Sequence, residues 1–112
     1  MPEIDKNTFN DLKEMSGEDF IVELIDTFLE DSPKMIAEIK SAYASGDVEA
    51  FRRAAHSLKS NAATFGAQHL AALAKELEML GKENKLNEIG DRLKTLDEVY
   101  EAARRELAGL KS

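Results

Sequence analysis

Apolar residues recur every three or four positions along most of the chain, which is the spacing of helices that bury one face. Strand-like alternation is nearly absent. The two prolines and six glycines stand singly, and the glycines lie mostly where the apolar period stops. This pattern predicts a succession of amphipathic helices.

The first predicted helix is short, spanning residues 7–15, with Phe9 and Leu12 facing inward. Ser16, followed three residues later by Asp19, resembles a capping box. We therefore expect a second helix to begin just after Ser16.

The second predicted helix has its apolar residues on one side. They are Phe20, Ile21, Leu24, Ile25 and Phe28, and then Met35, Ile36, Ile39 and Tyr43. Pro33 interrupts this pattern, so we expect a kink there or a restart with Ser32 as the cap. The helix should end near Gly46.

Three further helices follow. Asp47 can cap a third helix that runs to Phe65 and ends at Gly66. A fourth, over residues 67–80, should end at Gly81. It buries Leu70, Leu73, Ala74 and Leu77. The last helix has apolar residues three or four apart, typical of packing along its full length. They are Leu86, Ile89, Leu93, Leu96, Tyr100, Ala103, Leu107 and Leu110.

Short connections between long amphipathic helices imply antiparallel neighbours. The sequence therefore predicts an all-α fold, an antiparallel up-and-down four-helix bundle over residues 17–112 with a short additional N-terminal helix. A chain of 112 residues is enough for one core, so we expect a single domain over residues 1–112.

Composition narrows the class of protein. With 43% apolar and 33% charged residues, the chain suits a soluble globular domain. The absence of cysteine excludes disulfides, thiolate metal sites and cysteine nucleophiles. No apolar run approaches the ~20 residues that cross a bilayer. The start, MPEIDKNTF, lacks the features of a secretory signal, so we expect a cytoplasmic protein without membrane contact. The net charge of −7 argues against nucleic-acid binding.

The third predicted helix places a histidine away from its buried face. At about 100° per residue, one face carries Phe51, Ala54, Ala55, Leu58, Ala62 and Phe65. His56 lies about 140° from that face. Its neighbours one or two turns away are Arg52, Lys59, Ser60 and Ala63. We therefore expect His56 on the solvent side, among cations and small side chains.

Two interpretations of His56 compete. In the first, it is an exposed histidine without a role, Arg52, Arg53 and Lys59 are a solvated face, and the alanines are good helix formers. His69, the other histidine, has no distinctive neighbours and is assigned no role.

In the second interpretation, His56 is a nucleophile, because a neutral imidazole is competent at neutral pH. A phosphoryl group on it would place an anion in mid-helix, where no free N–H groups are available. Lys59, one turn on, is placed to supply the cation. Ser60 and Ala63 keep the surface low, which suits the approach of another active site for in-line transfer.

The segment AHSLKSNAATFGAQHLAALAKELE, from Ala55 to Glu78, closely resembles the signature of histidine-containing phosphotransfer (HPt) domains of bacterial and related phosphorelays. It has the His-x-Leu-Lys core, a glycine ten residues after the histidine, and an amphipathic helix ending in Leu-Glu. The motif covers about a fifth of the chain, and the predicted bundle extends the resemblance over nearly all of it.

The resemblance implies roles for individual residues. His56 aligns with the phosphorylated histidine and Lys59 with the lysine that interacts with the phosphoryl group. Gln68 matches a glutamine often found near the histidine, where it orients the ring or the phosphoryl group. Ser60 stands where the family most often has glycine, a departure that still allows close approach. Gly66 resembles the residue at the tight join between the third and fourth helices.

The implied activity is a reversible phosphoryl shuttle. A nitrogen of His56, expected to be Nε2, attacks a phospho-aspartate on a response-regulator receiver domain, and a second receiver then takes the group. A glycine-rich phosphate loop and a GxxxxGK[ST] run are absent, so the chain is expected to be a carrier and not an enzyme with its own nucleotide or metal site. It needs no cofactor, because Mg²⁺ belongs to the receiver.

The implied partners are receiver domains, with a hybrid sensor histidine kinase as a further candidate, and the chain is expected to be a monomer. Arg52, Ser60 and Ala63 are the predicted docking residues, since a basic rim complements the acidic active site of a receiver. The sequence is compatible with a free-standing protein and with one domain of a larger kinase.

Three other functions compete with this interpretation. A metal-binding bundle needs Glu-x-x-His pairs, but Arg53 and Gly66 stand three residues before the histidines. An acyl carrier needs an Asp-Ser-Leu attachment site, and Pro33 disrupts the match at residues 31–33. A module that binds receivers without transferring phosphate stays open.

Overall fold

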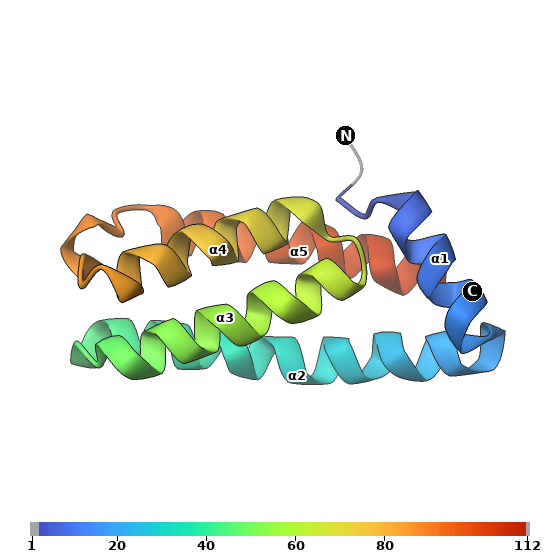
Figure 1. The fold of residues 1–112 in the computed structure, drawn as a ribbon, viewed down its shortest axis with the longest axis horizontal. Coiled ribbons are helices and arrows are strands. Elements are labelled where there is room, and N and C mark those ends of the chain that lie inside the picture. The colour runs from blue at the N-terminus through green and yellow to red at the C-terminus, as the bar shows by residue number, and fades with distance from the viewer. Residues whose placement is uncertain (1–2, 112) are drawn as a thin grey trace.

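The computed structural model describes residues 3–111, which form five α-helices and one 3₁₀ turn (Figure 1). Their bounds are α1 Lys6–Ser16, α2 Glu18–Ser45, α3 Val48–Thr64, α4 Gln68–Lys82, η1 Leu86–Glu88 and α5 Arg92–Leu110. The four long helices lie along the long axis of the molecule, and α1 crosses one end of it (Figure 1). The predicted all-helical class is confirmed.

The core lies between the helices and contains most of the apolar residues that the periodicity indicated, although Tyr43 is 39% exposed. All six residues predicted for the inner face of α3 are buried, and Phe51 and Leu58 are fully so. Phe9 is the buried residue of α1, and Leu12 packs beside the core at its edge. None of the helices within residues 3–111 has the length and hydropathy needed to span a membrane.

The junction between α1 and α2 differs from the predicted capping box. Ser16 is the last residue of α1, and Gly17, with φ of 90°, separates the two helices. No side chain caps the first turn of α2. The prediction that Ser16 opens α2 is wrong, because the turn is made by the backbone of a glycine that adopts positive φ without strain. Phe20, predicted to face inward, is 50% exposed just after this corner.

Helix α2 continues without a break through Pro33, so the predicted restart at Ser32 is wrong. Ser32 is fully buried, and its hydroxyl donates to the carbonyl of Phe28 at 2.5 Å. Since that uses its one proton, Ser32 Oγ accepts from Tyr100 Oη at 2.7 Å. Pro33 itself is exposed, so the carbonyl of Leu29 that loses its amide partner can be hydrated. Packing against α5 thus sustains the helix past its proline.

Gly81 does not end α4, as the sequence predicted, but lies buried inside it. A β-carbon at this position would stand 3.0 Å from Cδ1 of Phe51. The glycine is therefore needed for close packing of α4 on α3. The helix ends one residue later, and the left-handed position is taken by Asn84, with φ of 59°.

The last helix is shorter than predicted. Leu86 lies in the separate turn η1, and Ile89 follows it before Gly90, whose φ is 55°. Helix α5 begins only at Arg92. The apolar spacing runs on through this region because Leu86 and Ile89 still face the core, although the backbone between them is not α-helical.

The predicted ends of α3 are confirmed. Asp47 caps its first turn by accepting from the amide of Ala50 at 3.1 Å. Gly66, with φ of 77°, joins α3 to α4. The N-terminal segment crosses this join, where the amide of Asp5 donates to the carbonyl of Gly66 at 2.7 Å and Ile4 is fully buried.

We expect Gly66→Ala to lower the free energy of unfolding by about 2 kcal/mol or more. The φ of Gly66 disfavours any side chain, and the new β-carbon would stand 2.8 Å from the carbonyl oxygen of Asp5. Urea denaturation measures the change. Gly109→Ala is the control, because a β-carbon there meets no atom within 4 Å. Equal stability of the two variants would contradict the close approach at this join.

Candidate functional site

His56 lies in the middle of α3 with its side chain 55% exposed, as its position on the helical wheel predicts. Its Nδ1 is 2.7 Å from Oε2 of Glu78, which comes from α4. Lys59, one turn further along α3, places its Nζ 2.7 Å from the other oxygen, Oε1, of the same carboxylate. A single carboxylate therefore bridges the histidine and the lysine.

The join at Gly66 explains how these residues meet. His56 precedes it by ten residues and Glu78 follows it by twelve, so packing α4 back on α3 brings the two side chains level. Fully buried Leu58 and Leu77 lie directly next to the site residues in sequence and hold the two helices together there. The site is thus set by helix packing rather than by a mobile loop.

Charge at the site follows from this geometry. The hydrogen bond from Lys59 is the main reason that the pKa of Glu78 is lowered, with a further contribution from His56 and an opposing one from burial. Glu78 is therefore an ionised acceptor at neutral pH, and its side chain is only 15% exposed.

The carboxylate determines which ring nitrogen is available. Since Glu78 can only accept, the neutral form of the His56 ring bonded to it has its proton on Nδ1 and its lone pair on Nε2. No protein atom within residues 3–111 is hydrogen-bonded to Nε2. His56 accordingly presents a nucleophilic nitrogen to solvent, while its other nitrogen is anchored.

The predicted docking residues stand four or seven positions from His56 along α3. Ser60 and Ala63 are exposed and add little height to the surface of α3. Arg52 is half-buried, and its guanidinium is paired with Glu49 at 2.8 Å. The net positive charge around His56 is therefore lower than the number of nearby cations indicates.

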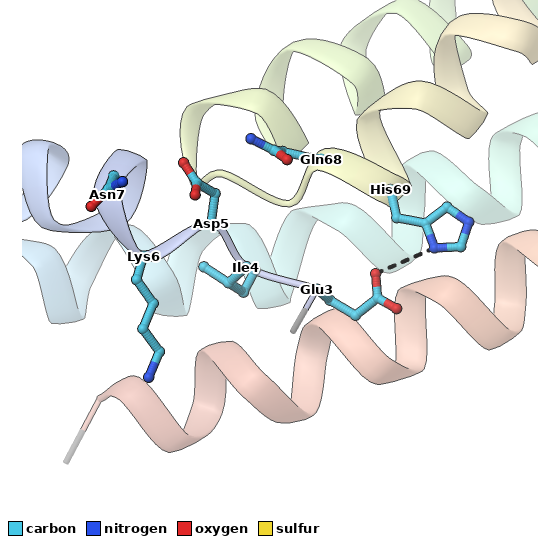
Figure 2. A pocket seen from close by; sticks show the side chains of 7 residues that line it. All are labelled: Glu3, Ile4, Asp5, Lys6, Asn7, Gln68 and His69. Atoms are coloured by element: carbon cyan, nitrogen blue, oxygen red, sulfur yellow. Dashed lines mark ion pairs between the residues drawn. The ribbon is translucent and has the colours of Figure 1, made fainter. Parts of the chain in front are cut away.

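Gln68 is not brought to His56. It is the first residue of α4 and lines an open pocket with Glu3 to Asn7 and His69 (Figure 2). Glu78, which contacts His56, lies ten residues further along the same helix, or about 15 Å along its axis. The orienting role that the resemblance implied for Gln68 has no support in this geometry.

His69, the histidine without an assigned role, points into that same pocket. Its Nδ1 is 3.4 Å from Oε2 of Glu3, a pair that Figure 2 shows with a dashed line. The side chain is 60% exposed, and an exposed pair of this kind contributes little to stability. Lys6 also lines this pocket, but within residues 3–111 no lysine is paired with Glu3 as Lys59 is paired with Glu78.

Glu78 is the site residue that the sequence reasoning missed. It ends the segment that carried the family resemblance, but no role was given to it. Its position opposite His56 could in principle be predicted, because residues at similar distances before and after a tight join between two packed helices face each other. Within the part of the chain that the structure describes, no group of three or more histidine, aspartate or glutamate side chains could hold a metal ion.

Comparison with known proteins identifies the family of the chain. A family model described as Hpt domain matches residues 23–106, a span that includes His56, Lys59 and Glu78. The crystal structure of histidine-containing phosphotransfer protein B (HptB) from Pseudomonas aeruginosa PAO1 is similar over 98% of this chain and 95% of that one. The TM-score is 0.91 and the sequence identity is 27%. No curated protein sequence matches the chain.

Proposed function

The chain belongs to the family of Hpt domains, and from this premise we propose that it carries a phosphoryl group on His56 between receiver domains of a phosphorelay. A phosphotransfer role in two-component signalling follows from the family and from the similarity to HptB. The observation that supports His56 as the carrier is its exposed ring, with Nδ1 held by Glu78 and Nε2 free of protein partners.

In the proposed reaction, the lone pair of Nε2 attacks the phosphorus of an aspartyl phosphate on the receiver. The P–O bond to the aspartate breaks, its electron pair stays on the leaving carboxylate, and an N–P bond forms on His56. The reverse step passes the group to the aspartate of a second receiver. We expect Mg²⁺ to be held by the receiver, so that this chain acts as a carrier without its own nucleotide or metal site.

The same proposal places Lys59 at the phosphoryl group. Its Nζ is one turn from His56 and is held by Glu78 while the ring is free. A dianionic group on Nε2 would offer a second acceptor to this cation, since the middle of a helix has no free N–H groups to supply.

We expect Lys59→Met to lower the rate of phosphoryl transfer to His56 about 10- to 100-fold, the loss of one hydrogen bond to a charged group. This rate is measured by mixing the chain with a phosphorylated receiver and quenching samples of the reaction at successive times. Lys94→Met, which removes an exposed lysine of α5, should leave it unchanged. Equal rates for both variants would contradict the role of Lys59.

Docking is proposed to use the surface around the ring, including Arg52, Ser60 and Ala63. The two small residues leave Nε2 accessible to the recessed aspartate of a receiver. The positive charges of Arg52 and Lys59 complement the acidic site of the receiver. Glu49 and Glu78, which are paired with them, offset part of this positive charge.

We further propose that the chain is a cytoplasmic monomer and that receivers or a hybrid sensor kinase are its partners. We propose that α2 to α5 form an antiparallel up-and-down bundle, because successive helices run in opposite directions along the long axis in Figure 1. A monomer leaves the His56 face free for the partner.

The test of the proposal is transfer from a phosphorylated receiver to this chain. Receivers can be loaded with acetyl phosphate and mixed with the purified chain. The proposal predicts label that is labile in acid and stable in base, as expected for phosphohistidine. A chain that binds receivers but takes no label from any of them would instead be a module for binding alone.

A further inference from the structure

Helices α4 and α5 lie side by side in the bundle (Figure 1), and an open groove follows the line between them. It consists of two adjoining hollows, of about 340 Å³ and about 400 Å³, which share Ala72, Glu76 and Arg92 in their lining. The other lining residues are Lys75, Met79 and Leu80 in the first hollow, and His69, Leu73 and Thr95 in the second. The groove therefore follows α4 for about three turns.

This groove and the His56 site lie on different flanks of α4. Glu78 faces α3, where it contacts His56. With 3.6 residues per turn, Met79 lies about 100° and Ala72 about 120° around α4 from Glu78. A molecule that lies in the groove therefore leaves the ring of His56 open to another protein.

The floor of the groove is apolar and partly exposed. Met79 is one of the large apolar side chains that the fold leaves on its surface, with 46% of it exposed. Ala72, two turns earlier on the same face of α4, is exposed as well. Leu80 packs against the core and still lines the groove beside them. Apolar residues at this spacing form a surface that suits the apolar face of another helix.

Lysines border this apolar floor. Lys75 lines the groove, and Lys82 continues the same row two turns later. Both are exposed, and neither has an ion-pair partner within residues 3–111. Among the described lining residues, Glu76 is the one carboxylate, and it is paired with Arg92 at 3.5 Å. The lining therefore has two cations against one carboxylate, on a chain whose net charge is −7.

We propose that this groove binds an acidic amphipathic helix of a partner protein. Its apolar face would pack on Met79 and Ala72, and its carboxylates would pair with Lys75 and Lys82. The net negative charge of the chain repels an acidic helix elsewhere, whereas the unpaired lysines attract it here. A straight groove of about three turns matches a helix that presents apolar residues at positions i, i+3, i+4 and i+7. This inference goes beyond the carrier role and does not depend on it.

The experiment uses two synthetic helical peptides of about 15 residues as probes. Both have leucines on one face; glutamates flank the leucines in the first peptide, and lysines replace these glutamates in the second. Each is titrated into the unphosphorylated chain without any receiver, and binding is followed by the fluorescence anisotropy of the labelled peptide. We expect the acidic peptide to bind with a Kd on the order of 100 µM, and the lysine peptide to bind at least about tenfold more weakly.

NMR of methyl-labelled methionine locates the bound peptide. The methyl signal of Met79 should move as the acidic peptide is added. The signals of Met15 in α1 and Met35 in α2 should stay in place, because neither residue lines the groove. This readout does not require that any residue be changed.

Substitutions test the two parts of the proposed contact. Met79→Glu, in the apolar floor, and Lys75→Glu, at its border, should each weaken binding of the acidic peptide at least about tenfold. Met15→Glu and Lys34→Glu are the matched controls, because they make the same changes at exposed positions of α1 and α2 outside the groove. Both controls should bind the peptide as the wild type does. Circular dichroism checks that each variant keeps its helices.

The proposal is overturned if no saturable binding occurs, if the two peptides bind equally well, or if the variants in the groove bind as well as their controls. A shift of Met15 or Met35 in place of Met79 would also contradict it. Sedimentation of the chain alone tests another occupant. A monomer leaves the groove to a partner, whereas a dimer that Met79→Glu dissociates would assign it to a second copy of this chain and overturn the proposal.

Discussion

His56→Gln should take no phosphoryl group from any receiver while keeping the fold. The glutamine amide has no nucleophilic lone pair to replace Nε2, so the loss of label should be complete and not merely partial. The side chain of His56 is 55% exposed and lies outside the core. We therefore expect the free energy of unfolding to change by no more than about 0.5 kcal/mol. Labelling with a phosphorylated receiver and urea denaturation measure the two quantities.

The matched control for this variant is His69→Gln. His69 is also a histidine on a helix surface, 60% exposed, and its Nδ1 also lies near a glutamate. Among residues 3–111 no lysine is paired with that glutamate, and His69 should be dispensable for labelling. Label on His56→Gln, or its loss in His69→Gln, would place the phosphorylated nitrogen elsewhere and contradict the assignment.

Phe51→Ala should have the largest effect on stability, lowering the free energy of unfolding by about 3–5 kcal/mol. The ring is fully buried, and its Cδ1 lies 3.0 Å from where a β-carbon of Gly81 would stand. It therefore packs directly on the backbone of α4, and its removal leaves a cavity between the two helices that carry His56 and Glu78. A domain of ordinary stability, about 5–15 kcal/mol, would lose a large part of it.

Urea denaturation tests this expectation, with Phe20→Ala as the control. Phe20 is the same residue type but half-exposed at the start of α2, and its loss should cost about 1 kcal/mol or less. A cost for Phe51→Ala no greater than that of the control would show that the contact with Gly81 contributes little.

The sequence predicted the helical class and the exposed position of His56 because both depend on periodicity. Six apolar positions of α3 define one face, and no tertiary contact is needed to see that His56 lies opposite. The N-cap at Asp47 could also be predicted from the sequence, since an N-cap is a local interaction between residues three apart.

Two of the errors arose where residues distant in sequence decide the local structure. Pro33 and Ser32 resembled a break, yet the hydroxyl of Tyr100 in α5 satisfies Ser32 and α2 continues. Gly81 resembled a stop signal, yet its role is to make room for Phe51. Local propensity alone cannot distinguish these cases, because the partner lies in another helix.

For the same reason, the candidate site could be predicted only in part from the sequence. His56 and Lys59 are one turn apart on a single helix, so their proximity follows from sequence. Glu78 reaches them only because α4 packs back on α3 after Gly66. Gln68 was assigned by resemblance alone, and the register of that packing places it at the opposite end of α4 from Glu78.

The most direct test of the account is a relay with two receivers and this chain. The first receiver is labelled, freed of its phosphoryl donor and mixed with the second, either alone, with wild type or with His56→Gln. We predict that label reaches the second receiver at an appreciable rate only when wild type is present, with acid-labile label passing transiently through the chain. Label that reaches the second receiver equally fast with His56→Gln would contradict the central claim that His56 carries the phosphoryl group.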